Sequence, residues 1–600
     1  MAGVARALFV PLALAVAFSM IASYFLASSL VPILETWFNR NHAPGADHGG
    51  RATAFERFGD AFGLFSQRLI HWRWPIVAVY LVGTGAVIFL AGDRLGTDIF
   101  LQVDTGLIQM RLRAPTGTRV ERTEGITQVV LEGIRRQVGE DNVESSLAFV
   151  GVQLSSFPVN LIFLWTSGPH EAVMRVAVKP EAGISTAELQ ERLRRRIPEI
   201  SPGAAVTFEA ADLVSQVMSF GAPTPVEVAV ASPNLQTNRE YAETIVGELR
   251  RIPTLCDLQL GELLEYPTVD IQVDRDRAGQ LGVTVSDVGR APGPATGSSR
   301  FTTPVYWADP RSGIAYQVQV ELPQSRISSL EDLRSIPVKN HGAAATLLRD
   351  VAAVSDGNML GEYHRFNMQR MVTVTANVEG ADLGGVASEI SSALARLPEP
   401  PRGVTVSVRG QIAPLNLMVG NLQLGLALSG IAVFLLLAAY FQSIRVAFVV
   451  LLAIPSVLAG RVLALLVTGT TLNIQSFMGA MMTVGISVAN TILLCTFADQ
   501  YRRQGIPATE AAAEAARTRI RPVLMTSIVM ITGMLPLAFG APQTAPLGIA
   551  VIGGLAAATM TTLLAIPSIF TIIEGRSGTA SPSIDPDDAA SPHYDGAVRA

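Results

Sequence analysis

Long apolar runs are the feature that most constrains the fold of this chain of 600 residues. Runs of about 18 or more apolar residues can cross a bilayer as helices. Residues 92–417 contain no such run, so they must form a folded region outside the membrane. The runs predict seven spans, at residues 8–34, 74–91, 419–440, 446–468, 474–498, 523–540 and 545–573.

Composition narrows the functional class. Hydrophobic residues make up 49% of the chain and charged residues only 16%, which is typical of membrane spans joined to a soluble region. The net charge of -5, without a basic face, argues against nucleic acid as a partner. Cys256 and Cys495 are far apart and suggest neither a disulfide framework nor a metal cluster. The sequence therefore predicts no metal site and no cofactor.

The distribution of arginine predicts the orientation in the membrane, because basic residues favour the cytoplasmic side. The short loops 468–473 and 540–546 carry no basic residue. Residues 92–417 are therefore predicted to lie on the outer face, with the N-terminus outside and the C-terminus inside. Two other linkers are arginine-rich, through Arg40, Arg51, Arg57, Arg68 and Arg73 in the first and Arg502, Arg503, Arg517, Arg519 and Arg521 in the second.

The first arginine-rich linker, residues 36–73, has a helical pattern of its own. Its apolar residues recur at helical spacing between arginines, which predicts an amphipathic helix on the cytoplasmic membrane surface. The alternative is a helix packed on a protein domain. The pattern consists of Phe55, Phe58, Phe62, Phe65 and Leu69. The C-terminal tail, residues 575–600, is small, polar and acidic, and is predicted to be a disordered cytoplasmic segment.

The outer block alternates strand-like and helix-like patterns. The stretches "GLIQMRLR", "VESSLAFV" and "AVMRVAVK" read as strands, and "STAELQERLRRRI" reads as a helix. Such strand–helix–strand units predict ferredoxin-like, split βαβ sandwiches. The fold class is thus a multi-span α-helical membrane protein with a large periplasmic α+β region. Its predicted parts are a first subdomain (92–224), a second subdomain (225–265 and 356–417) and an insertion in the second (266–355).

Catalytic and metal-binding motifs are weak in this block, and no enzyme is predicted. The glycine-rich "GPATGS" lacks the Lys-Ser/Thr pair of a phosphate-binding loop. His170, His341 and His364 are scattered, without metal-like spacing. Methionines could bind Cu(I) or Ag(I), although methionine more often fills cores. The candidates are Met110, Met174, Met218, Met359, Met368 and Met371.

Four stretches resemble the inner-membrane subunit of resistance–nodulation–division (RND) efflux pumps. These are "PTGTRVERTE", "VDRDRAGQLGVTVSDV", "TGTTLNIQSFMGAMMTVGISVANTILL" and "RTRIRPVLMTSIVMITGMLPLAFG". The resemblance implies a homotrimer of twelve-span subunits in the bacterial inner membrane, working with a periplasmic adaptor protein and an outer-membrane channel. It also implies that residues 1–35 match the last span of the first half and that the rest matches the second half, residues 418–574 being its last five spans. This places the N-terminus outside, although Arg6 favours the inside. The outer block would then consist of periplasmic porter subdomain 1 (92–224), porter subdomain 2 (225–265 and 356–417) and an inserted docking subdomain (266–355).

The resemblance further implies a proton path. In this family an aspartate pair in the first half takes up the proton, supported by second-half residues. These positions match Asn490, Arg519 and Thr526, whereas the lysine of the family falls on Ala489. Ser487 and Thr491 share the same apolar stretch. Such side chains either line the proton path or bond neighbouring helices together, and Arg519 is equally explained as a positive-inside residue.

Arg461 is the one charge predicted to lie within a span. No Asp or Glu falls inside the seven predicted spans, so no counter-ion is expected there. Arg461 stands about 10 Å from the outer end of its span, which favours a side chain that snorkels to the periplasmic interface. Pairing with a carboxylate of the missing half is the alternative.

The sequence leaves three candidate functions to be tested. The first is proton-driven export of small lipophilic or amphiphilic compounds, by a homotrimer or a complex with a first-half subunit in membrane lipid. Phe149, Leu154 and Phe157 lie in an apolar stretch positioned like the family's substrate-contacting loop, although core packing explains them equally well. The second is heavy-metal-ion efflux by the same architecture. The third is a proton-inactive half-subunit that acts as a scaffold.

Overall fold

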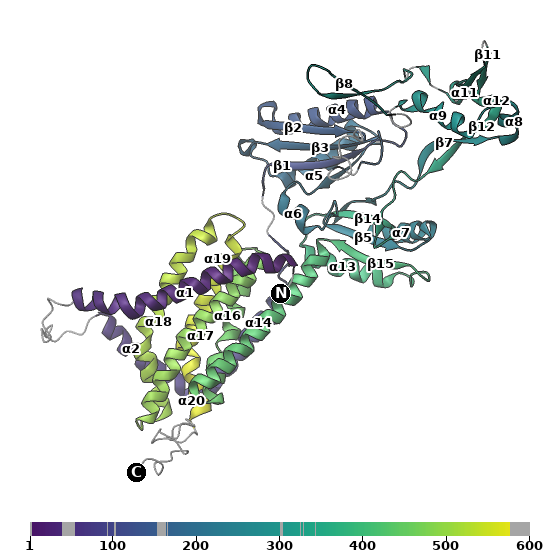
Figure 1. Cartoon of the computed structure of the whole chain (residues 1–600). Helices are drawn as coiled ribbons and strands as arrows, with labels where there is room; N and C mark the ends of the chain where they lie inside the picture. The colour runs from purple at the N-terminus through teal and green to yellow at the C-terminus, as the bar shows by residue number, and fades with distance from the viewer. Residues whose placement is uncertain are drawn as a thin grey trace, which may run out of the picture.

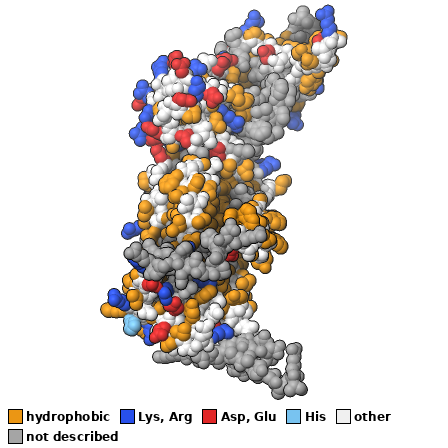
Figure 2. Space-filling view, turned by 90° about the vertical axis from the view of Figure 1, so that its left-hand side faces the viewer, with side chains coloured by type: hydrophobic (Ala, Val, Ile, Leu, Met, Phe, Trp, Pro, Cys, Tyr) orange, Lys and Arg blue, Asp and Glu red, His pale blue; other side chains and the backbone are white. Residues whose placement is uncertain are grey.

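Two regions make up the molecule, a bundle of long helices and an α+β region at one end of it (Figure 1). Hydrophobic side chains gather over the bundle, whereas acidic and basic side chains gather on the α+β region (Figure 2). The predicted fold class is confirmed. The computed structural model describes residues 3–38, 54–92, 94–100, 104–152, 164, 166–299, 304–323, 326–327, 329–341 and 344–575.

Among these described residues, seven helical segments are long and apolar enough to cross a membrane, as predicted. The helices of this region are α1 (Gly3–Phe38), α2 (Ala54–His71), α3 (Arg73–Ala86) with the π-helix η2 (Val87–Ala91), α14 (Ile412–Phe441), α15 (Ile444–Leu451), α16 (Ile454–Val467), α17 (Ile474–Arg503), α18 (Ala508–Phe539), α19 (Ala545–Leu564) and α20 (Ile566–Glu574).

Proline explains where two predicted spans break. Pro455 stands in the first turn of α16, and its ring nitrogen cannot continue the hydrogen bonding of α15. Pro567 separates α19 from α20 in the same way. Helix α18 is longer than predicted and begins at Ala508, because the alanine-rich "ATEAAAEAA" has high helix propensity.

The linker helix α2 packs on α18 through small residues. Gly63 lies against the side chain of Arg517, whose Nη2 pairs with Asp60 Oδ1 at 2.6 Å. Phe58 and Phe65 remain about half exposed, at 49% and 51%. One face of α2 therefore contacts protein, and Phe62 of the predicted apolar pattern packs there against Ile520 and Val523 of α18. Phe58 and Phe65 stay half exposed, as the predicted membrane-surface role requires.

The first sandwich is a four-stranded antiparallel sheet with two helices on one face. The strands lie in the order β2-β3-β1-β4, and the core forms between the sheet and the helices. Its elements are β1 (Leu107–Arg113), α4 (Val120–Val138), η3 (Glu140–Asn142), β2 (Val143–Val150), β3 (Glu171–Val178), η5 (Pro180–Ala182), α5 (Thr186–Ile200) and β4 (Ala205–Glu209). Helix α6 (Leu213–Met218) leads to the second sandwich.

The second sandwich repeats the topology of the first. Strand β14 pairs with β5 on one side and β6 on the other, and β15 pairs with the far edge of β5. Counted along the chain, the strands of both sheets therefore stand in the order 2-3-1-4. The elements are β5 (Val226–Ala231), α7 (Leu235–Leu249), β6 (Leu255–Leu260), β14 (Gln369–Val378), α13 (Leu383–Arg396) and β15 (Thr405–Gly410).

An insertion separates β6 from β14, where the first sandwich has only the β2–β3 connection. Strands β7 and β12 pair antiparallel along their whole lengths, so β12 extends beyond the predicted end of the insertion. The docking role of this part stays a prediction. Its elements are β7 (Tyr266–Val273), α8 (Arg275–Gln280), α9 (Val285–Arg290), α10 (Gly293–Thr296), β8 (Val305–Ala308), β9 (Ala315–Val318), α11 (Leu330–Arg334), β10 (Pro337–His341), β11 (Ala344–Leu347), α12 (Leu348–Val351), β12 (Ala352–Met359) and β13 (Arg365–Phe366).

A short segment between η2 and β1 ties the two regions together. The backbone N–H of Asp98 donates to the carbonyl of Leu472, just before α17, at 2.9 Å. The Asp98 carboxylate accepts from the N–H of Leu383 at 3.0 Å, and the Asp382 carboxylate accepts from the N–H of Thr97 at 2.8 Å. The start of α17 and the start of α13 are thus fastened to the same few residues.

Candidate functional site

A cavity of about 730 Å³ lies between the two sandwiches. One wall is the face of the first sheet that its helices leave uncovered. Because side chains alternate along a strand, β1 presents Gln109, Arg111 and Arg113 to the cavity. The intervening residues of the strand are buried in the hydrophobic core, namely Ile108, Met110 and Leu112.

The second sheet forms the opposite wall by the same alternation. Its cavity face carries Glu227 on β5, Thr373 on β14 and Arg409 on β15. The intervening residues fill the core against α7 and α13, namely Val226, Val228, Val372 and Val374. Two uncovered polar sheet faces therefore confront one another across the cavity.

The carboxylates of the first wall are held by neighbouring donors. Glu209 accepts from Gln109 Nε2 at 2.7 Å and from Arg111 Nε at 2.7 Å. Glu171 accepts from Arg113 Nε at 2.6 Å and from Arg111 Nη1 at 3.3 Å. Burial alone would raise the pKa of Glu171, but the two guanidinium groups outweigh it and hold that pKa below its ordinary value. This wall stays ionised and internally paired.

The second wall holds a histidine between two carboxylates. His364 Nδ1 lies 2.9 Å from Glu262 Oε1, and its Nε2 lies 3.4 Å from Glu362 Oε1. Glu262 also accepts from the N–H of Thr373 at 2.7 Å. The hydrogen bond to Glu262 raises the pKa of His364. Burial raises the pKa values of Glu362 and Glu227, so this wall changes charge more readily than the first.

Hydrogen bonds and ion pairs join the two sandwiches beside the cavity. Arg113 donates to the carbonyls of Leu260 at 3.1 Å and Gly261 at 2.6 Å, both at the end of β6. Arg194 of α5 pairs with Asp257 of β6 at 3.0 Å. These contacts fix the sandwiches to each other and so define the cavity.

Of the three predicted substrate-contact residues, the structure describes only Phe149. Phe149 is half-buried on β2, where it pairs across the strand with Val173, and it does not line the cavity. Leu154 and Phe157 lie outside the described residues. Their proposed contact with substrate stays a prediction.

The candidate metal ligands are dispersed. Met110 and Met174 are buried in the first core, and Met359 and Met368 are exposed. Of the six methionines only Met371 lines the cavity. Within the described ranges, no group of three or more His, Cys, Asp or Glu is arranged to hold a metal ion.

The sequence contained a signal for the cavity that motif reasoning missed. Charged or polar residues alternate with apolar ones on β1 and β14, which marks a sheet face that is polar yet not free in solvent. Arg111 and Glu171 are almost fully buried, at 7% and 0% exposure. The sequence pattern that could have located the cavity is therefore arginine and glutamate at alternate positions of strands that pair with one another.

The polar stretch of α17 faces two neighbouring helices. Thr526 Oγ1 of α18 donates to Asn490 Oδ1 at 3.4 Å, so the structure brings these two predicted residues together. Ser487 lies one turn away and is buried, and its hydroxyl has no hydrogen-bond partner among the described residues. Thr491 bonds to Thr562 of α19 at 3.1 Å, which is the helix-bonding role.

Arg519 lies apart from this pair. It is seven residues before Thr526 on α18, about 10 Å along the helix axis. Its guanidinium carbon stands 3.6 Å from the ring centroid of Phe497, and its Nε has no hydrogen-bond partner in the described part of the chain. Stacking on an aromatic ring stabilises an arginine, so this geometry favours neither of the two predicted roles.

The prediction that Arg461 snorkels to the interface is wrong. The side chain is buried at 8% exposure, and its guanidinium carbon lies 5.0 Å from the ring centroid of Phe477. Its Nε and Nη1 have no hydrogen-bond partner within the described ranges. Helices α16 and α19 approach closely at Gly460 and Gly553, where an added Cβ would lie 2.4 Å from a backbone oxygen. This tight packing encloses the segment that carries Arg461.

Helix α17 continues to Arg503, beyond the predicted end of its span, and so includes a carboxylate. Asp499 is buried and pairs with Arg502 at 2.8 Å and with Arg503 at 2.8 Å. Glu574 at the end of α20 lies 3.8 Å from Arg502. The acidic groups at this end of the bundle are therefore neutralised by arginine.

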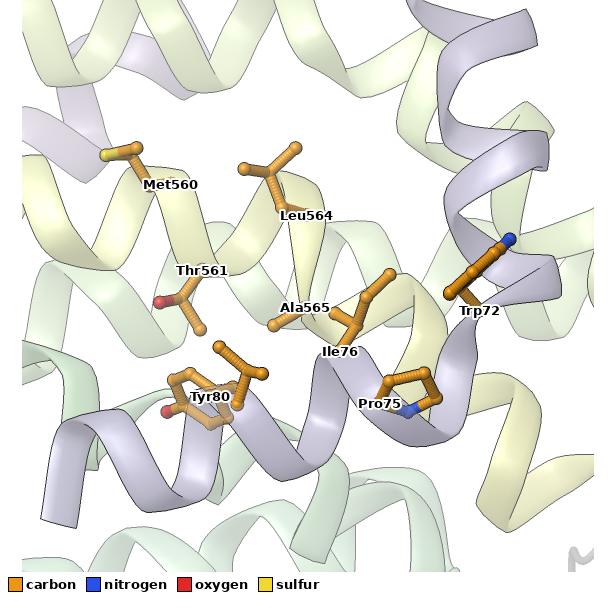
Figure 3. Close-up of a pocket in the computed structure, with 9 residues that line it drawn as sticks. Trp72, Pro75, Ile76, Tyr80, Met560, Thr561, Leu564 and Ala565 are labelled. Carbon is orange, nitrogen blue, oxygen red and sulfur yellow. The ribbon is translucent and has the colours of Figure 1, made fainter.

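An apolar hollow of about 340 Å³ lies between α3 and α19 in the bundle. In Figure 3, Trp72, Pro75, Ile76 and Tyr80 face Met560, Thr561 and Leu564 across it. The lining is almost entirely hydrocarbon, and it lies beside candidate spans. This hollow matches an acyl chain of membrane lipid rather than a polar compound.

Comparisons with known proteins agree with this architecture. The model of the AcrB/AcrD/AcrF family matches residues 1–574. Protein HelA of Legionella pneumophila is 26% identical over 96% of this chain and 54% of its own length. The toluene efflux pump membrane transporter TtgB of Pseudomonas putida is 24% identical, over 92% of this chain and 50% of its own length.

A solved structure is similar as well. The chain in the crystal structure of a heavy metal efflux pump is 25% identical in sequence to this chain, with a TM-score of 0.75. The match covers 88% of this chain and 53% of the chain in that crystal structure. The chain thus spans about half the length of the relatives that it matches.

Proposed function

Because the chain belongs to the AcrB/AcrD/AcrF family, we propose that it acts as half of an RND-type permease that exports lipophilic or amphiphilic compounds. It is a multi-pass protein of the bacterial inner membrane. Its relatives are about twice as long. The proposed assembly is a homotrimer or a complex with a first-half subunit, joined to a periplasmic adaptor protein and an outer-membrane channel.

One observation carries the proposal, namely the cavity between the two sandwiches. Its volume of about 730 Å³ is in the range of small-molecule sites. It combines charged walls with exposed ring surfaces, because Phe220 and Tyr363 also line it. Such a lining suits molecules that have both a polar and an apolar part.

Coupling to the membrane would run through the segment before β1. Asp98 fastens this segment to Leu472 at the start of α17 and to Leu383 of α13. A shift of α17 would therefore pull on the second sandwich and change the cavity. The Asn490–Thr526 pair lies on the same helix α17 and its neighbour α18, where it would orient a proton that another group accepts.

Export in cells tests the proposal. The chain would be co-expressed with a first half taken from a full-length relative, in a host without its own efflux pumps. Accumulation of the dye Nile red should fall when both parts are present and recover on adding a protonophore. Tyr363→Ala should weaken export, whereas Val129→Ala, at an exposed position of α4 outside the cavity lining, should not. Unchanged accumulation with both parts present would contradict the proposal.

Heavy-metal-ion efflux is the second candidate. Cobalt-zinc-cadmium resistance protein CzcA of Cupriavidus metallidurans is 24% identical to this chain. Imidazole and carboxylate suit divalent cations, and His364 lies 2.9 Å from Glu262 and 3.4 Å from Glu362. These three groups are nevertheless not arranged to hold a metal ion, nor is any other group of three or more His, Cys, Asp or Glu among the described residues. Glu262 is also already engaged by Thr373. Increased resistance to Zn²⁺ or Cd²⁺, without a change in dye accumulation, would decide for metal.

A further inference from the structure

We propose that the cavity between the sandwiches selects anionic amphiphiles, molecules with a carboxylate, sulfonate or phosphate group on an apolar body. The inference rests on the proposed function and names its class of substrate. The charge available to a ligand is that of the side chains in the cavity that are not already paired with another side chain of the protein.

The acidic groups at the cavity have little to offer a cation. Glu209 is occupied by Gln109 and Arg111, each at 2.7 Å. Glu227 lies 3.5 Å from Arg409, and Glu362 lies 3.4 Å from His364. A positively charged ligand would have to compete with a cation of the protein for each of these three carboxylates.

Two arginines of the lining are not engaged by a carboxylate among the described residues. Arg365 lines the cavity, and its exposed guanidinium has no hydrogen-bond or ion-pair partner in the part of the chain that the structure describes. Arg175 donates from Nε to Gln109 Oε1 at 2.7 Å, which leaves its two NH₂ groups for a ligand. The lining contains five arginines, namely Arg111, Arg113, Arg175, Arg365 and Arg409, against the three glutamates Glu209, Glu227 and Glu362. Two further glutamates outside the lining, Glu171 and Glu262, pair with Arg111, Arg113 and His364, so the charge left for a ligand is that of Arg175 and Arg365.

Guanidinium groups are well suited to the ligand chemistry proposed. Their planar N–H groups match carboxylate and phosphate oxygens in pairs, and a charge-assisted hydrogen bond is stronger than a neutral one. Because Arg365 is at the edge strand β13 and Arg175 is on β3, the free donors come from both walls. An anionic head between the walls could reach both.

The apolar part of the ligand has surfaces to contact. Phe220 and Tyr363 line the cavity and are 62% and 54% exposed. Phe220 adopts a φ of 50°, a left-handed conformation that is uncommon for a bulky residue. The chain therefore holds this ring exposed at a cost in backbone strain, which fits a contact surface for a hydrophobic body.

A matched pair of fluorescent probes tests the charge preference. 8-Anilinonaphthalene-1-sulfonate carries a sulfonate, and N-phenyl-1-naphthylamine has the same aromatic body without it. Binding to the purified full chain in zwitterionic nanodiscs would be measured by fluorescence, with empty nanodiscs subtracted. The anionic probe should bind about tenfold more tightly, the effect of one charge-assisted hydrogen bond.

Arginine variants locate the effect. Arg365→Gln and Arg175→Gln should each weaken the anionic probe by roughly tenfold and leave the neutral probe unchanged. Arg365→Lys, which keeps the charge, should restore most of the affinity. Arg311→Gln removes an exposed arginine outside the cavity lining and serves as the matched control.

Different failures separate this inference from the proposed function. Equal binding of both probes, or loss of anionic binding in Arg311→Gln alone, would overturn the charge preference while leaving compound export intact. If neither probe binds, and Tyr363→Ala changes nothing, the cavity is not the compound site and both proposals lose their support.

Discussion

The cavity between the sandwiches and the polar stretch in the bundle differ in how their polar atoms are satisfied. In the cavity, Glu209 and Glu171 each accept hydrogen bonds from two side chains. In the bundle, the Ser487 hydroxyl, Arg519 Nε and two nitrogens of Arg461 have no hydrogen-bond partner among the described residues. Buried polar groups are normally paired, so the second pattern calls for an explanation.

The difference indicates which part of the function this chain can perform by itself. A paired network holds its shape without help, so the cavity has the fixed geometry that the proposed binding of a compound requires. Unpaired polar groups within apolar helices are costly unless other polar groups meet them. We infer that compound binding is contained in this chain, whereas proton coupling needs groups from outside the described residues.

The largest expected effect comes from breaking the network of the cavity. Arg111→Met would leave Glu209 and Glu171 without a shared donor, in a site where Arg111 is only 7% exposed. Loss of one partner from a buried ion pair costs about 3–5 kcal/mol. Urea unfolding of the full chain, followed by tryptophan fluorescence, would measure the loss. Arg195→Met, on an exposed pair with Glu191, is the control and should cost less than about 1 kcal/mol.

Removing the unpaired charge of the bundle should have the opposite sign. Arg461→Met keeps most of the side-chain volume and removes a buried cation whose Nε and Nη1 have no hydrogen-bond partner among the described residues. The free energy of unfolding should rise by about 1–3 kcal/mol, measured by titration with sodium dodecyl sulfate in detergent micelles. Leu463→Met on the same helix controls for the new side chain. A decrease in stability would show that Arg461 has a counter-ion. It would contradict the contrast between the paired polar groups of the cavity and the unpaired ones of the bundle.

A smaller effect is expected from pH at the cavity. The raised pKa of His364 keeps it charged to higher pH, and the raised pKa values of Glu227 and Glu362 let them lose charge as the pH falls. Both changes make the cavity more positive at low pH. The affinity for the anionic probe should therefore rise, by roughly threefold to tenfold, between pH 8 and pH 5. The charged groups that face these three residues are Arg113, Glu171, Glu262 and Arg409.

The pH effect has its own control. His364→Gln should flatten the upper part of the pH profile, because the uncharged amide cannot gain a proton. The neutral probe should show no such dependence. An affinity for the anionic probe that falls with decreasing pH would contradict the charge assignment of this wall.

The smallest effect on stability is expected for the membrane pair. Thr526→Ala removes a hydrogen bond of 3.4 Å to Asn490, and such bonds between membrane helices average about 0.6 kcal/mol. Export by the co-expressed halves should nevertheless weaken if the pair orients a proton. The nearby Ser527→Ala, which breaks a bond of 2.7 Å to Thr559, separates the two causes. Equal export by both variants would leave Thr526 with a helix-bonding role only.

Much of the fold could be predicted from sequence because periodicity reports burial. Strand β2 falls at the predicted residues, and the apolar runs locate all seven spans. Packing between segments could not be predicted in this way, because a single sequence does not show which faces of the helices and sheets meet. The burial of Arg461 depends on the close approach of α16 and α19, and the exposure of Phe58 depends on which face of α2 meets α18.

The candidate functional site could likewise be predicted only in part. The Asn490–Thr526 contact could be predicted because the resemblance supplied the positions. The charged cavity could not be found by motif, because its residues come from eight strands and become a site only when two sheet faces meet. Arg111 and Glu171, sixty residues apart in the chain, illustrate this.

Proton flux in reconstituted vesicles tests the division between binding and coupling most directly. The chain alone would be placed in vesicles with a pH-sensitive dye inside and 8-anilinonaphthalene-1-sulfonate outside. We expect the chain to bind the probe but to show no probe-dependent proton flux, and we expect flux once a first half with its aspartate pair is added. Probe-dependent proton flux from the 600-residue chain alone would contradict the account.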